Sequence, residues 1–182
     1  ADAIITYTGN ASPSANYVWS FPNAIVTSGF GAGPYTVHWN TPGTYTITLT
    51  VDQAGCIGTQ TAHSVTVFQN PTACFAMPDT ACVNDLNQVV YNCNASIAAQ
   101  YNWTFGNAVV VSGAGQGPYT VSWTNAGTYP ISLQVIEDGC VSPIETNFVT
   151  VLPLPVAAIT PVSDQCFNGN SFNFTYAGTT PV

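Results

Sequence analysis

The chain has 182 residues, of which 46% are hydrophobic, and its formal net charge is −8 because it contains no lysine and no arginine. Nucleic acid and anionic membranes are bound through such cations, so both are excluded as partners. Disordered proteins combine low hydrophobicity with high net charge, and this chain, with many hydrophobic and few charged residues, does not have that composition. It also has no run of about 18 apolar residues, so direct membrane insertion is not expected.

The first clear element is a strand over 44–51. Tyr45, Ile47, Leu49 and Val51 alternate with four threonines. A period of two is typical of a strand with one buried face. No segment of the chain shows a helical period.

Between residues 71 and 154 the sequence predicts seven short strands. They are rich in Val, Ile, Thr, Tyr and Trp and are separated by Gly, Pro and Asn, and they span 73–77, 88–93, 100–105, 108–112, 119–123, 127–136 and 146–152. Seven strands at this spacing favour an all-β protein built from immunoglobulin-like β-sandwiches.

The chain repeats itself at an offset of 84 residues. GPYTVHW at Gly33 returns as GPYTVSW at Gly117, and residues 1–70 match 85–154 at 31 positions without a gap. Such a fixed period indicates tandem modules. We therefore expect three segments: a repeat without its first strand over 1–70, a complete repeat over 71–154, and the first strands of a third repeat over 155–182.

Six aromatic residues recur in register and are predicted to form the core. Trp19 and Trp103 would lie in a central strand between the two sheets. Tyr45 and Tyr129 follow a Gly-Thr turn, where each would either fill the neighbouring core position or hydrogen-bond across a corner. Trp39 and Trp123 end the repeated seven-residue phrase and complete the set.

No catalytic set is predicted. The two histidines, His38 and His63, correspond to Ser122 and Asn147 in the next repeat, and an enzyme would not exchange its base between copies. No nucleophile stands in a pattern with a base and an acid. The chain is therefore predicted not to be an enzyme and to need no cofactor.

The segments YVWSFPNA, YNWTFGNA and PGTYTITLTVDQAGC resemble the polycystic-kidney-disease (PKD) domain, in the style of the repeats of large surface adhesins of Bacteroidota. The resemblance implies a seven-stranded sandwich, tandem arrangement and export to the cell surface. It departs from the family where Ser20, Thr104, Asn23 and Asn107 replace the acidic residues of the W-D-F-G-D turn. That departure argues against an ion bound at the turn.

Six cysteines suggest disulfides if the chain is secreted, although sequence alone leaves 15 pairings. The repeat register predicts one bond within the complete repeat, Cys82–Cys140. Cys74 and Cys93 have no counterparts in the other copies, so a second bond is predicted between them. Their spacing fits no zinc pattern.

Cys56 and Cys166 then have partners only in other repeats or other chains. The simpler interpretation is that this chain is a slice of a longer array. In the alternative, copies join head to tail, each donating its last strands to the next, as a homopolymer.

The acidic residues offer little for a metal. Only Glu137 and Asp138 are adjacent, and the matching Gln53 and Ala54 are uncharged, so calcium is the weaker possibility at this pair. Thr80, in Asp79-Thr80-Ala81, resembles the acceptor motif for O-glycosylation in the same bacteria. We consider it a glycosylation candidate on an exposed loop.

Two functions fit these observations. The preferred one is a non-catalytic spacer that extends an adhesive tip from the cell within an extracellular fibre or adhesin stalk, with copies of the repeat as its partners. Short proline-containing linkers between repeats would limit bending. The alternative is a module that binds glycans or surfaces within a secreted protein.

Overall fold

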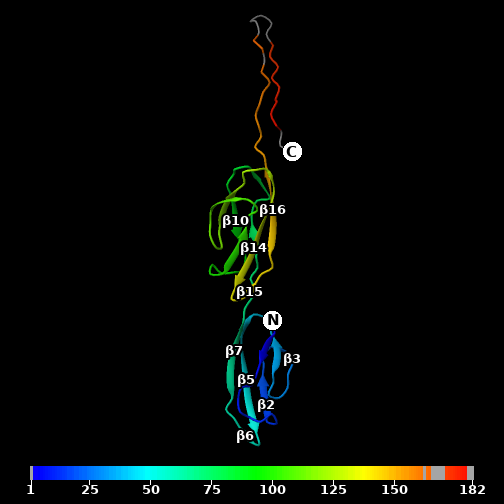
Figure 1. Cartoon of the computed structure of the whole chain (residues 1–182), viewed down its shortest axis with the longest axis vertical. Coiled ribbons are helices and arrows are strands. Elements are labelled where there is room, and N and C mark those ends of the chain that lie inside the picture. The colour runs from blue at the N-terminus through cyan, green and yellow to red at the C-terminus, as the bar shows by residue number, and fades with distance from the viewer. Residues whose placement is uncertain (1, 162, 165–170, 180–182) are drawn as a thin grey trace. The chain divides into compact units, whose positions relative to one another are not determined.

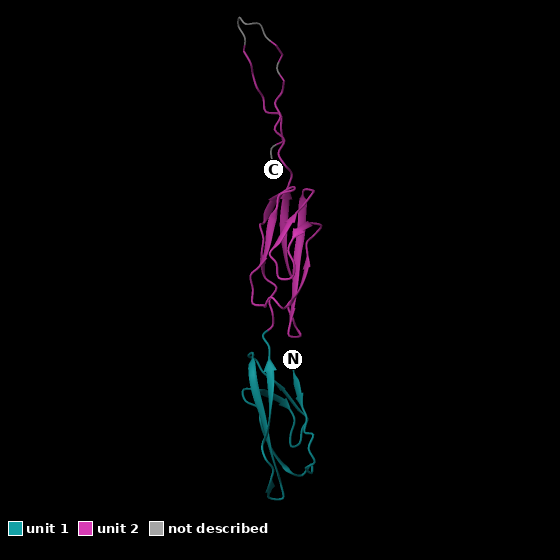
Figure 2. Ribbon diagram, turned by 90° about the vertical axis from the view of Figure 1, so that its left-hand side faces the viewer, with its two compact units in different colours: residues 1–69 teal, residues 70–182 magenta. Residues whose placement is uncertain are grey.

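The structure, a computed structural model, describes residues 2–161, 163–164 and 171–179. The chain divides into two compact units, Ala1–Gln69 (unit 1) and Asn70–Val182 (unit 2), which Figure 2 colours separately. The described residues form strands and no helix, so the all-β prediction is confirmed. Accordingly, nothing in the described part of the chain has the helical length and apolarity to span a bilayer.

Unit 2 contains the more complete sandwich (Figure 1). Its strands are β8 (Phe75–Ala76), β9 (Thr80–Cys82), β10 (Asn87–Tyr91), β11 (Gln100–Thr104), β12 (Val109–Ser112), β13 (Tyr119–Ser122), β14 (Gly127–Glu137), β15 (Cys140–Val141) and β16 (Glu145–Leu152). One sheet has the order β12-β13-β10-β8 and the other the order β11-β14-β16-β9, with β15 paired to β14.

Alternation along β14 explains how the two sheets are held together. Ile131, Leu133 and Val135 on one face are fully buried, while the residues between them are only half-buried. They pack in one core with Val89 and Val121 of the opposite sheet. Burying one such side chain contributes about 1.5–3 kcal/mol, which makes this core the main source of stability in a chain that has no Lys or Arg for ion pairs.

The second strand of unit 2, β9, runs in the same direction as the last, β16. β9 pairs with β16 in parallel, with Ala81 opposite Val151 and Cys82 opposite Leu152. The chain approaches β9 from Pro71, which is fully buried near the far end of β10, where the Tyr91 hydroxyl donates to the Thr72 carbonyl at 3.0 Å. Residues 71 and 152 therefore lie at opposite ends of the sandwich.

Unit 1 repeats this architecture with fewer strands. They are β1 (Ala3–Ile5), β2 (Asn16–Ser20), β3 (Ile25–Ser28), β4 (Tyr35–His38), β5 (Gly43–Gln53), β6 (Cys56–Ile57) and β7 (Thr61–Val67). They form a sheet β1-β4-β3 and a second sheet in which β5 pairs with β2, β6 and β7. Among residues 2–69, no strand takes the places of β8 and β9.

The missing strands leave the core of unit 1 partly open. Val149 and Val151 of unit 2 are 0% and 2% exposed, whereas the matching Val65 and Val67 are only half-buried. Ile47 and Leu49, deeper in the sheet, are still buried at 3% and 8% exposure. The loss of burial includes the edge that β9 covers in unit 2, but it is not confined to that edge, because Ile5 of β1 and Trp39 are also less buried than their counterparts.

Among the described residues after Leu152, Ile159 and Tyr176 form an isolated antiparallel bridge. The hydroxyl of Tyr176 donates to the Val156 carbonyl at 3.0 Å. Both contacts copy unit 2, where Phe75 pairs with Tyr91 and the Tyr91 hydroxyl donates to Thr72. The segment thus has the pairing with which a repeat begins.

The observed strands of unit 2 lie where the alternation predicted them, with two additions. β9 and β15 are only three and two residues long; Thr80 of β9 was expected on a loop, and no strand was predicted over the residues of β15. Neither has enough residues to show a period. The pairing partner of β9, moreover, lies about 70 residues away in the sequence.

Candidate functional site

Two adjoining hollows lie in unit 1. A groove of about 570 Å³ adjoins a second of about 490 Å³. The two share the residues Tyr7, Gly9, Leu49 and Thr61, so we treat them together as the open groove. Its walls also include Ile5, Trp19 and His63.

In unit 2 the matching space is filled by β8. Phe75 is 7% exposed and meets the ring of Trp103 edge-on, with ring centroids 5.1 Å apart. Trp19 is the counterpart of Trp103 and lines the open groove instead. The groove is therefore the vacant position of a repeat's first strand.

Each unit has the same three-ring cluster beside this position. Trp103 stacks on Phe105 at 5.6 Å and contacts Tyr119, and Trp19 does the same with Phe21 and Tyr35. The indole nitrogen of Trp103 donates to the Gly115 carbonyl at 3.1 Å, as that of Trp19 does to Gly31. Both tryptophans are half-buried against the core, so their role is structural.

The tyrosines after the Gly-Thr turns bond across a corner. The Tyr129 hydroxyl donates to the Asn125 carbonyl at 3.0 Å, and that of Tyr45 to Thr41 at 2.8 Å. Each ring stacks on the tryptophan that directly follows the preceding strand, Trp123 after β13 or Trp39 after β4. A tyrosine that bonds back to the backbone a few residues upstream is a hallmark of one sandwich family. The units are immunoglobulin-like sandwiches.

No protein-family model matches this chain, and a search of curated proteins finds no match either. Among solved structures, fibronectin(III)-like modules of CbhA from Clostridium thermocellum align at 17% identity and a TM-score of 0.35, covering 84% of this chain and 86% of theirs. Human mucin-like protocadherin EC1-2 aligns at 12% identity and 0.28, over 85% and 99%. Such low scores support no argument, so the fold assignment rests on topology.

The cysteine predictions are met in part. Cys74 and Cys93 form a disulfide, with Cα atoms 5.7 Å apart, so that pairing is confirmed. The predicted Cys82–Cys140 bond is wrong, because both thiols are free. Cys56 is free and exposed as well. Cys166 lies outside the described residues, so its pairing with another repeat or chain stays a prediction.

The geometry of β14 explains the error. Cys140 lies opposite Glu137 at one end of this strand, whereas Cys82 lies beyond Gly127 at the other, through Val151 and Leu152 of β16. Ten residue steps along a strand cover about 33 Å. A disulfide needs Cα atoms within about 7 Å.

Glu137 has a local structural role. Its carboxylate accepts from the Ser96 backbone at 2.9 Å, just as the Gln53 side chain accepts from Ser12 at 2.7 Å. Among the described residues, no three His, Cys, Asp or Glu side chains gather where a metal could bind. That calcium is not needed here stays a prediction.

Acid is expected to release the turn at Ser96 but not its counterpart in unit 1. Hydrogen bonds from the Ser96 hydroxyl, and then from its amide, hold the pKa of Glu137 below its ordinary value of 4.5. Because the pKa of this carboxyl group is lower in the folded state than in the unfolded state, its hydrogen bonds stabilise the fold at a pH above the unfolded-state pKa. This stabilisation is lost as the pH falls through the folded-state pKa. The amide resonance of Ser96 should titrate below about pH 4.5.

The Ser12 amide, bonded to the uncharged Gln53, serves as the internal control and should not titrate. The Glu137→Gln variant should remove the Ser96 titration. A Ser96 amide that still titrates in that variant would contradict this assignment.

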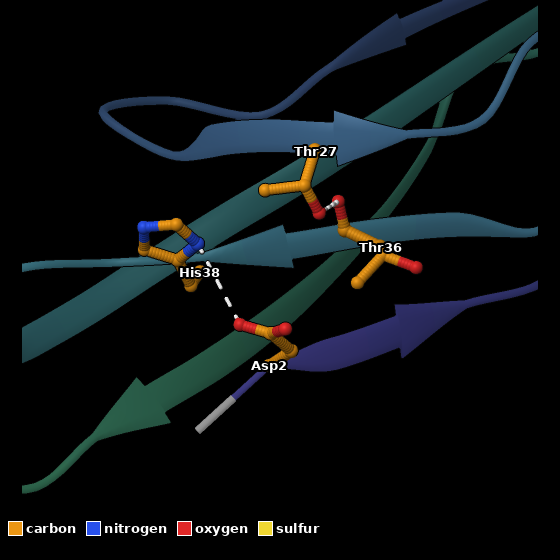
Figure 3. A network of polar contacts seen from close by, with 4 residues as sticks. All are labelled: Asp2, Thr27, Thr36 and His38. Atoms are coloured by element: carbon orange, nitrogen blue, oxygen red, sulfur yellow. Dashed lines mark hydrogen bonds and ion pairs between the residues drawn. The ribbon is translucent and has the colours of Figure 1, made fainter.

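Neither histidine belongs to a catalytic arrangement. The Nδ1 atom of His38 lies 3.6 Å from a carboxylate oxygen of Asp2, which is too long for a hydrogen bond (Figure 3). Beside this pair, the Thr27 hydroxyl donates to the Thr36 carbonyl at 3.1 Å, within the pairing of β3 and β4. His63 lies on β7 at the wall of the open groove.

The turn that follows the Trp-x-Phe strand, where this chain lacks the acidic residues of the polycystic-kidney-disease pattern, is tight in both units. Asn23 and Asn107 adopt φ of 58° and 63°. Asparagine is enriched in this left-handed region, which explains its presence without an ion. Ser20 ends β2, and the Thr104 hydroxyl is hydrogen-bonded to that of Ser132 at 2.5 Å.

Thr80 is exposed, as predicted, but it is the first residue of β9 and not part of a loop. Its backbone pairs with Thr150 in the parallel ladder. Its glycosylation stays a prediction.

Ser142 is a structural residue that the sequence did not reveal. It is 3% exposed, accepts from the buried Val135 amide at 2.9 Å and donates to the Pro143 carbonyl at 2.8 Å. The matching residue in unit 1 is Gly58, so the repeat register gave no sign of this role.

Replacing Ser142 with alanine should destabilise unit 2 by about 1–3 kcal/mol, because the Val135 amide would be left buried without a partner. Hydrogen exchange of β14 measures this effect. Ser112→Ala on the exposed strand β12 is the matched control and should change stability by less than about 0.5 kcal/mol. Equal effects of the two variants would contradict the role of Ser142.

Proposed function

We propose that this chain is a structural repeat segment of an extracellular surface fibre or adhesin stalk, a non-catalytic spacer whose copies extend an adhesive tip from the cell. One observation carries the proposal. The parallel pairing of β9 with β16 places residues 71 and 152 at opposite ends of unit 2. Because the polypeptide chain enters such a module at one end and leaves it at the other, each additional copy lengthens the array.

The dimensions of the strands support the same role. β14 has 11 residues and extends along the whole sheet, which corresponds to about 36 Å. With a short linker such as Pro153–Pro155, a repeat of 84 residues would add roughly 35–45 Å to a fibre.

The chemistry of the chain fits an extracellular location. The Cys74–Cys93 disulfide is typical of oxidising compartments, because cytosolic thiols are kept reduced. The polycystic-kidney-disease-like segments around Trp19 and Trp103 add the expectation of a bacterial cell-surface protein. Thr80, exposed at the start of β9, is the proposed glycosylation site of this glycoprotein.

Electron microscopy of the intact natural material tests the proposal. An axial repeat of about 35–45 Å, or a multiple of it, is expected along a thin filament. Compact particles without any axial repeat would contradict it.

A further inference from the structure

The open groove of unit 1 is bordered by backbone that is paired in unit 2. β8 pairs with β10 through Ala76 opposite Val90 and Phe75 opposite Tyr91. The corresponding positions of unit 1 are Thr6 and Tyr7, which directly follow β1. Among residues 2–69, nothing pairs with them, although β1 does pair with β4 on its other side.

We propose that the open groove binds residues 155–161 of a second copy of this chain, which pair with Thr6 and Tyr7 as β8 pairs with β10. Copies of the chain then associate head to tail. The inference rests on the proposed function, since it supplies a way in which segments of the fibre join without a covalent bond.

The sequence of the donated segment matches that of the strand it would replace. Pro155-Val156-Ala157-Ala158-Ile159 stands 84 residues after Pro71-Thr72-Ala73-Cys74-Phe75. In unit 2, Ala73 and Phe75 are the buried residues of this stretch, at 6% and 7% exposure. Ala157 and Ile159 occupy the same alternating positions, so an alanine and a large apolar side chain would again point into the groove.

Ile159 is available for such a contact. It is 66% exposed in its own chain, and its flanking residues pair with a single strand, the one that contains Tyr176. An isolated two-stranded pairing is only marginally stable in water. In the groove, Ile159 would lie opposite Tyr7 instead of Tyr176, so one tyrosine replaces another and Trp19 is added as a packing surface.

The charges do not oppose the contact at the groove itself. Residues 155–161 contain no charged side chain, and the only ionisable groups that line the groove are Tyr7, His63 and the free Cys56. Each whole chain carries −8, however. Association should therefore be stronger at 0.5 M than at 0.01 M sodium chloride, because salt screens the repulsion between copies.

The natural disulfide of unit 2 supplies a template for testing the register. Cys74 is in the donated stretch and Cys93 in the accepting one, and their counterparts between copies are Ala158 and Gly9. A chain with Ala158→Cys mixed with a chain with Gly9→Cys should form a disulfide between positions 158 and 9, with the Tyr7 side chain shifted to make room for the new Cβ at position 9. Ala157→Cys is the matched control, because neighbouring strand residues point to opposite faces.

Peptide mapping by mass spectrometry under non-reducing conditions identifies this linkage apart from any that the natural cysteines form. We expect the 158–9 linkage to exceed the 157–9 linkage by at least about tenfold. A 158–9 yield no higher than the 157–9 yield overturns the proposal.

Light scattering of the full chain during size-exclusion chromatography provides the second measurement. Species at multiples of 19.1 kDa are expected to grow with protein concentration. Ile159→Asp should abolish them, whereas Thr160→Asp, which matches the exposed Ala76, should retain them. Ile159 lies outside both sandwiches, so neither variant threatens folding.

Three outcomes of the light-scattering measurement also overturn the inference: a chain that stays at 19.1 kDa at every concentration, oligomers that persist in Ile159→Asp, and oligomers equally lost in Thr160→Asp. The first two leave the proposed function intact if the natural material still shows its axial repeat. If the chain does associate through Ile159 but the natural material shows no axial repeat, the proposed fibre function would be refuted and the binding of residues 155–161 in the open groove would stand.

Discussion

Replacing Trp123 with alanine is expected to lower the free energy of unfolding of unit 2 by about 3–5 kcal/mol. The side chain is 1% exposed in the core beside Tyr129, with ring centroids 6.1 Å apart. Few surrounding residues can move to fill a space of that size in a closed sandwich. Hydrogen exchange of the slowest amides of β14 in the full chain measures the loss.

The matching variant in unit 1, Trp39→Ala, is the control and should lower the free energy of unfolding of unit 1 by a smaller amount. Trp39 is only half-buried, and its indole nitrogen donates to the Pro22 carbonyl at 2.9 Å. Water already reaches part of that site, so truncation removes less buried surface. An equal or larger loss in unit 1 would show that unit 1 is closed in solution, for example by a strand from another copy.

Removing the Cys74–Cys93 disulfide with a Cys74→Ala/Cys93→Gly double variant should destabilise unit 2 by about 3 kcal/mol, since the bond closes a loop with a sequence separation of 19. These are the residues that the other copies carry at the same positions, Ala158 and Gly9. Urea unfolding of the oxidised chain and of the double variant measures the difference.

Cys82→Ser/Cys140→Ser is the matched control. Both thiols are free and half-buried, so this variant should lose much less stability than the first. If it were the more damaging of the two, the pairing in the structure would not be the pairing in solution.

The sandwich itself was predictable because local patterns specify it. The alternation over 127–136 marked β14, and the recurring aromatic residues correctly placed Trp103 against the core of unit 2. The short strand β9 was not predictable, because its three residues are defined by a partner about 70 positions away.

The same distinction explains the cysteines. Register showed that Cys82 and Cys140 recur in the repeat, but recurrence does not show that two residues are close. Cys74 and Cys93 were recognised because the other copies lack them, and they lie close together because Cys74 directly precedes β8 and Cys93 closely follows its pairing partner β10. The repeat register predicted that residues 1–70 lack their first strand, but only the sheet order shows which edge that strand would cover.

The parallel ladder between β9 and β16 also determines how unit 2 responds to traction. If residues 71 and 152 are pulled apart, the two strands slide along each other, and their hydrogen bonds are loaded together in shear. Those bonds include Thr150 to Asp79 at 2.9 Å and Val83 to Leu152 at 3.0 Å. These hydrogen bonds must break nearly simultaneously and not one after another, so a module of this kind would resist mechanical unfolding under a pulling force.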